Sequence, residues 1–149
     1  MSTRASYIFK DEYHAVCVYK HHDGYPEGAK EHIAKAVDFA WPLPRFEADE
    51  FGAAFVAANK LPDNYEKLPP EYRGGEVRLI PGGGDGWTTH TDIEYLYQIE
   101  CVDGHIQVKA WEVDYRSDSD RWTQKPIRGW TVKPPQASLA LGGAITPWT

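Results

Sequence analysis

Residues that form crosslinks are scarce in this sequence. It has two cysteines, Cys17 and Cys101, among 149 residues, and so low a number fits a reducing compartment better than an oxidising one. Both cysteines lie in strand-like runs, where a free thiol behaves as a small apolar side chain. We therefore expect both thiols to be buried and inert, which argues against a cysteine nucleophile.

Long apolar runs are absent as well. No window approaches the roughly 20 apolar residues that a transmembrane helix needs. The opening "MSTRASYIFKDEYH" also has no apolar stretch typical of a signal peptide. We therefore expect a soluble, cytoplasmic protein with no membrane partner.

Basic charge is in the minority. The chain has 16 Lys and Arg against 22 Asp and Glu, a net charge of -6, whereas binding to a phosphate backbone depends on clustered cations. We expect no nucleic-acid partner, although an acidic face could dock on a basic groove of another protein.

The hydrophobic content of 42% suffices for one core. We expect one domain over residues 1–133, followed by an uncharged tail over residues 134–149.

Hydrophobic periodicity predicts an α+β fold. Apolar runs on either side of the polar "DEYH" predict an N-terminal β-hairpin over residues 4–20. Apolar residues at helical spacing predict helices over residues 29–40 and 47–60, followed by a proline-rich loop and a strand over residues 76–80. Antiparallel strands then complete one sheet, and we expect the helices to pack on one face of it.

The clearest local pattern is a second hairpin in "DIEYLYQIECVDGHIQVKAWEV". If Asp103 and Gly104 form a two-residue type I′ turn, the register of the two strands follows. The pairs expected on the buried face are Cys101 with Ile106, Ile99 with Val108, and Tyr97 with Ala110. The later "RWTQKPIRGWTV" predicts a further strand, which Pro126 places at an edge.

The stretch "VYKHHDGYPEG" supports two interpretations. In the structural one, Asp23 caps a turn, Gly24 takes a positive φ and Pro26 sets the exit toward a helix. In the chemical one, the turn meets the later "THTDIEY" and forms an imidazole and carboxylate site. Its metal ligands or catalytic residues would be His22, Asp23, His90 and Asp92, with either histidine as general base and Glu94 as a further acid.

Geometry and motif content favour the structural interpretation. Adjacent strand residues point to opposite faces, so His21 and His22 should not both easily reach one ion unless the chain turns between them. The chain has no HExxH, CxxC or GxSxG motif, and "PGGGDGW" over residues 81–87 lacks the GK[ST] ending of a P-loop. We therefore expect no metal and no cofactor, and we lean against an enzyme.

Aromatic residues are abundant, with six tryptophans. Such side chains anchor protein interfaces, so they could form a recognition surface together with several tyrosines, Tyr97 and Tyr115 among them. The contact residues that we expect are Tyr25, Trp87, Tyr95, Trp111, Trp122 and Trp130. The alternative is that a second layer, or the partner subunit of a homo-oligomer, buries them.

The motifs "YKHHDGYPEG" and "HTDIEYLYQIEC" resemble those of a group of small proteins encoded in bacteriophages and prophages. The matching residues are His21, Asp23, Gly24, Tyr25 and Pro26, then His90, Asp92, Glu94 and Tyr95. The resemblance covers about the first two thirds of the chain. It implies a phage-type accessory protein that binds a host protein in the cytoplasm of a bacterium, for instance an inhibitor of a defence system of the anti-CRISPR kind. The alternatives are a small metal- or ligand-binding enzyme and an oligomer-forming module.

Overall fold

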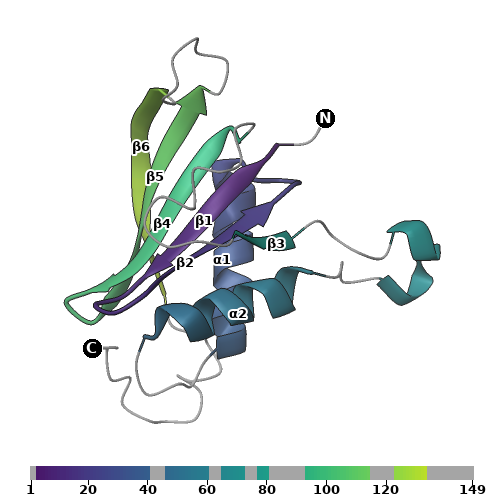
Figure 1. Ribbon diagram of the computed structural model, residues 1–149, viewed down its shortest axis with the longest axis horizontal. Coiled ribbons are helices and arrows are strands. Elements are labelled where there is room, and N and C mark those ends of the chain that lie inside the picture. The colour runs from purple at the N-terminus through teal and green to yellow at the C-terminus, as the bar shows by residue number, and fades with distance from the viewer. Residues whose placement is uncertain are drawn as a thin grey trace.

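This computed structural model describes residues 3–40, 46–60, 65–72, 77–80, 93–114 and 123–133. In these ranges the chain forms one six-stranded sheet and two α-helices, which confirms the α+β prediction (Figure 1). The strand order is β3-β2-β1-β4-β5-β6. The glycine-rich loop 81–87 and the tail 134–149, both singled out in the sequence, lie outside the described residues.

The N-terminal hairpin lies near the middle of the sheet. Strands β1 (Ala5–Lys10) and β2 (Ala15–Lys20) are antiparallel, as predicted, and β3 (Val77–Ile80) pairs with the outer side of β2. Between α2 and β3 lie two short 3-10 helices, η1 (Tyr65–Lys67) and η2 (Pro70–Tyr72). The chain thus returns from its helices to one edge of the sheet.

The sheet is mixed at its centre. Strand β4 (Tyr95–Val102) pairs with β1 in parallel, from Ala5 opposite Tyr95 to Lys10 opposite Glu100, whereas every other strand pair is antiparallel. Because β3 already occupies the outer side of β2, β4 joins the sheet on the opposite side of the hairpin, beside β1. The parallel pair was not expected from the sequence, which suggested antiparallel strands throughout.

The second hairpin confirms the predicted register. Strands β4 and β5 (His105–Asp114) pair Cys101 with Ile106, Ile99 with Val108 and Tyr97 with Ala110. The turn between them has positive φ at both central residues, 51° at Asp103 and 77° at Gly104, as a type I′ turn requires. Strand β6 (Thr123–Val132) follows at the edge and contains Pro126, with a bulge opposite Val108–Ala110.

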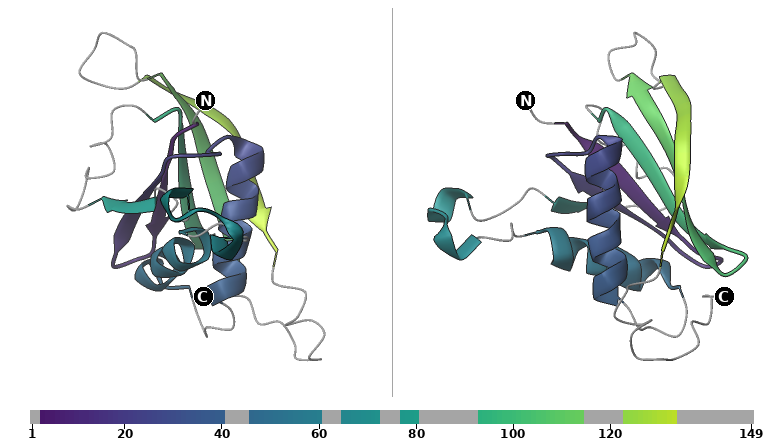
Figure 2. Two further views of the ribbon diagram at one scale, coloured as in Figure 1. Left: turned by 90° about the vertical axis from the view of Figure 1, so that its right-hand side faces the viewer. Right: turned by 180° about the vertical axis from the view of Figure 1, so that it is seen from behind.

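Both helices lie on one side of the sheet (Figure 2). Helix α1 (Pro26–Ala40) begins earlier than predicted, because Pro26 suits the first helical position, where no N–H is needed. Helix α2 (Ala48–Asn59) matches its prediction closely. In the ranges that the structure describes, neither helix combines the length and the apolar content needed to cross a membrane.

Aromatic rings form the centre of the main core. Tyr7 lies 4.5 Å from Phe55 and 5.2 Å from Tyr97 between ring centroids, and Phe9 lies 5.6 Å from Phe55. All four side chains are fully buried, so α2 is fixed on β1 by apolar packing. The opposite face of the sheet carries a second, smaller apolar cluster, whose buried members are Ile8, Cys17, Tyr19, Ile80, Ile93, Leu96 and Val113.

Candidate functional site

The HHDGYP turn has a different backbone from the one predicted. The residue with positive φ is Asp23, at 59°, and not Gly24. Position 24 requires glycine because the chain passes close to the start of β1 there. An added Cβ would lie 2.5 Å from the Cβ of Ala5 and 2.9 Å from the carbonyl oxygen of Thr3. The Gly24 N–H donates to that oxygen at 2.8 Å. The turn is therefore tied to the start of β1, and Pro26 begins α1 as expected.

The two histidine rings of this turn face each other. Their centroids are 4.7 Å apart, and the rings are nearly perpendicular. The sequence argument against a shared ion allowed for a turn of the chain here, and β2 does end at Lys20, directly before the pair. His21 Nδ1 is hydrogen bonded to the Tyr19 hydroxyl at 2.7 Å, and Lys20 Nζ donates to the His22 carbonyl at 2.8 Å.

The proposed second half of an acid–base or metal site, His90 and Asp92, lies outside the described residues. Glu94 is described, and its N–H donates to the Arg4 carbonyl at 2.9 Å. In the described ranges, no three His, Cys, Asp or Glu side chains come together in a way that could hold a metal ion. The chemical interpretation of His22 and Asp23 therefore stays a prediction.

Sequence reasoning missed His32, a half-buried residue on α1. Burial lowers its pKa to about 4, with Lys20 and Lys35 contributing in the same direction, so the imidazole is neutral near pH 7. Its carbonyl accepts a hydrogen bond from Asn59 Nδ2 at 3.0 Å, which joins α1 to α2. Its spacing of four residues from both Gly28 and Ala36, which are buried on α1, is the signal that could have revealed it.

Beneath the turn, two tyrosine hydroxyls differ in their partners. Tyr97 donates to the Gly24 carbonyl at 2.6 Å, whereas the Tyr7 hydroxyl, fully buried, has no hydrogen-bond partner among the described groups. Burial raises the pKa of both, and the carboxylate of Asp23 adds to the effect on Tyr7. Both phenols therefore stay protonated at neutral pH.

We expect opposite effects from removing these two hydroxyls. Tyr7→Phe should raise the free energy of unfolding by about 1 kcal/mol, because it deletes a buried polar group that gains no hydrogen bond. Tyr97→Phe should lower it by about 1–2 kcal/mol, because the Gly24 carbonyl loses its donor. Urea denaturation of both variants checks this. Destabilisation by Tyr7→Phe would show that the Tyr7 hydroxyl has a stabilising partner.

The aromatic residues expected to form a contact surface do not share one face where they are described. Trp111 is half-buried against the second cluster, whereas Trp130 lies on the helix side, 5.8 Å from the Tyr97 ring. Tyr95 stacks on Tyr97 at 6.2 Å, and Tyr97 itself is fully buried, which excludes it from any surface. Tyr25 is 41% exposed. Trp87, Trp122 and Tyr115 lie outside the described residues.

A pocket that sequence reasoning did not find lies where the tip of the first hairpin meets the N-terminus of α2. We call it the turn-end pocket, and its volume is about 600 Å³. The residues that line it are Lys10, Asp11, Glu12, Tyr13, His14, Phe46, Glu47, Asp49, Glu100 and Cys101. Five of these ten carry a carboxylate, so the lining is acidic at neutral pH.

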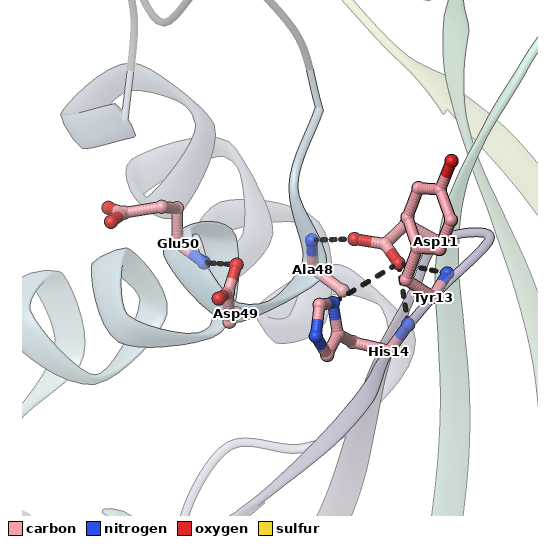
Figure 3. A network of polar contacts seen from close by, with 6 residues as sticks. All are labelled: Asp11, Tyr13, His14, Ala48, Asp49 and Glu50. Atoms are coloured by element: carbon pink, nitrogen blue, oxygen red, sulfur yellow. Dashed lines mark hydrogen bonds and ion pairs between the residues drawn. The ribbon is translucent and has the colours of Figure 1, made fainter.

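Asp11 holds the walls of the turn-end pocket together (Figure 3). Its Oδ1 accepts the N–H groups of Tyr13 and His14, each at 2.7 Å, which closes the hairpin turn. Its Oδ2 accepts the Ala48 N–H at 2.8 Å, which caps α2 across a separation of 37 residues. One carboxylate therefore fixes the turn to the helix.

The side chains at the rim and at the base of this pocket differ in exposure. Tyr13 is 83% exposed and Phe46 only 6%, so an aromatic ring stands at the rim while another closes the base.

The two cysteines differ in burial. Cys101 also lines the pocket and is half-buried, which corrects the prediction of full burial, whereas Cys17 is buried as expected. Burial raises the thiol pKa of Cys17 to about 12 and also raises that of Cys101.

The sequence contained one sign of this pocket. A tyrosine in a short turn between two strands, as in "DEYH", cannot reach the core and must be exposed. The approach of α2 to that turn depends on tertiary structure and has no local pattern. Comparison of the chain with protein-family models, with curated proteins and with solved structures finds no match in any of the three.

Proposed function

We propose that this protein is a phage-type accessory protein that acts by binding a host protein, and that the turn-end pocket is its contact surface. The observation that supports this best is the combination of an open pocket of about 600 Å³ with the 83% exposed ring of Tyr13 at its rim. Tyrosine is among the side chains that most often dominate the binding energy of protein interfaces.

The chemistry of the pocket suits a basic partner. Glu12 and Asp49 are exposed beside Tyr13, while Lys109 lies 3.2 Å from Glu100 and offsets its charge. An arginine or lysine side chain entering from a partner would meet carboxylates at the rim and the Phe46 ring at the base. Charge of this kind steers association and selects partners more than it adds affinity.

The resemblance to small phage-encoded proteins makes a bacterial host protein the expected class of partner. A protein that occupies a basic groove of a defence protein would block that groove from its own ligand. The role that follows is inhibition of a defence system by occupancy, with no reaction at the contact surface.

Site-directed photo-crosslinking in a bacterial host tests the proposal. A photoreactive phenylalanine analogue at position 13 should capture one host protein, because this position stands at the rim of the pocket. The matched control is the same analogue at Leu79, which is 64% exposed on β3, at the edge of the sheet. We expect capture from position 13 and none from position 79.

A competition experiment separates specific capture from chance contact. Added unlabelled protein should suppress the crosslink, whereas added protein with Tyr13→Ala and Asp49→Lys should not. Equal capture from positions 13 and 79, or equal competition by both added proteins, would contradict the turn-end pocket as the contact surface.

A further inference from the structure

The edge strand β6 presents a long open side. It pairs with β5 on one side, and no other strand of the described ranges lies beyond it (Figure 1). Most of its residues are exposed, including Lys125, Arg128 and Thr131. An edge of this length offers main-chain N–H and C=O groups to which a further strand can pair.

This edge is basic in an otherwise acidic protein. Residues 123–133 contain three cations, Lys125, Arg128 and Lys133, and no carboxylate, although the chain carries a net charge of -6. Lys125 lies opposite Glu112 of β5 in the strand register. Arg128 and Lys133 have no ion pair with any residue of the described ranges.

Helix α1 extends the basic strip. Lys30 Nζ lies 5.4 Å from the centroid of the Trp130 ring, so a fourth cation stands over β6. The half-buried Ile127, Trp130 and Val132 pack against the main core and hold the strand in place. The edge is therefore an ordered strand lined with cations.

We propose that β6 docks an extended acidic segment of another protein, which joins the sheet as an additional strand. The main-chain groups on the outer side of β6 match a polypeptide in β conformation. Arg128 and Lys133, which form no ion pair within the described ranges, would select carboxylates. This surface is separate from the turn-end pocket, whose acidic lining suits a basic partner.

A second copy of this chain fits the edge poorly. If two β6 strands paired, every charged side chain that they bring together would be a cation, and like charges across a pair are destabilising. The same cations protect the edge from self-association and leave it open to a strand of opposite charge.

The test uses a short acetylated peptide in which glutamate alternates with valine or threonine, titrated into the whole protein and followed by amide NMR. We expect shifts at residues 123–133 and at Lys30. A matched peptide with N-methyl groups on consecutive residues lacks donors along both of its edges, and it should bind about tenfold more weakly. Equal binding of both peptides, or shifts elsewhere only, would overturn the proposal.

Variants with reversed charge provide a second test. Arg128→Glu should weaken binding of the peptide by about tenfold, whereas Lys67→Glu, an equal reversal of charge on the exposed η1, should leave it unchanged. Tighter binding of an oligothymidine than of the peptide, or a dimer formed through β6, would also overturn the proposal. None of these results depends on whether position 13 crosslinks to a host protein.

Discussion

Gly28→Ala should lower the free energy of unfolding by about 3 kcal/mol, although alanine is the better helix former by about 1 kcal/mol. A Cβ at this position of α1 would overlap with the carbonyl oxygen of Asp23 and lie 3.1 Å from its carbonyl carbon. The obstacle is backbone, so it cannot rotate away as a side chain could. Thermal or urea denaturation of the variant measures the effect.

Gly52→Ala is the matched control, because Gly52 also lies inside a helix and is buried. There an added Cβ would lie 3.0 Å from the Cγ1 of Val16, a side-chain atom that can shift. We expect the gain in helix propensity and the tight contact nearly to cancel. Equal stability of the two variants would contradict the close approach of α1 to the backbone of Asp23.

Alanine at position 28 should also displace the HHDGYP turn, because the carbonyl oxygen that its Cβ would meet belongs to Asp23, a residue of that turn. Asp23 has a φ of 59°, which only the surrounding contacts maintain in a residue other than glycine. Amide NMR of Gly28→Ala should therefore show its largest shifts at residues 21–25. The packing of α1 against Asp23 therefore explains part of the HHDGYP motif.

Local patterns predicted the hairpins well. Alternation of apolar residues has a period of two, and the Asp103-Gly104 turn tolerates positive φ, so together they determine the β4–β5 register to the residue. The amphipathic spacing of Ile33 and Val37 likewise placed the buried face of α1. These predictions depend only on residues close together in the sequence.

The pairing of strands far apart in the sequence was harder to predict. The parallel pairing of β1 with β4 joins residues 90 positions apart, such as Ala5 and Tyr95, and no local pattern indicates it. The sequence placed the HHDGYP histidines where the second strand stops, and β2 does end at Lys20, but no local pattern indicated that their rings are in contact. The turn-end pocket was missed for the same reason, since Asp11 meets Ala48 only in the folded chain.

Asp11→Ala should lower the free energy of unfolding by about 3 kcal/mol, because three main-chain N–H groups lose their acceptor. The hydrogen bond from Ala48 is partly buried, so water replaces it less easily than the exposed bonds from Tyr13 and His14. The loss should separate the hairpin tip from the start of α2 and should also abolish the crosslink from position 13. Asp11→Asn keeps one acceptor oxygen, and we expect about half of the destabilisation.

The pH dependence of stability provides an independent test of this carboxylate. Burial alone would raise the pKa of Asp11, but the hydrogen bonds from Ala48, Tyr13 and His14 outweigh it and hold the pKa below the ordinary value of 3.8. Because the folded state has the lower pKa, the contribution of Asp11 is fully present above the unfolded value and is lost as pH falls through the folded one.

The comparison of wild type with Asp11→Asn isolates this contribution. The difference in free energy of unfolding between them should stay constant from neutral pH to about pH 5 and should shrink as the pH falls below the ordinary value of 3.8. The remaining ionisable groups are common to both proteins, so the difference reports mainly on Asp11. A difference that grew on acidification would mean that Asp11 is protonated more readily in the folded state, and the hydrogen bonds that join the turn to α2 could not then stabilise its charge.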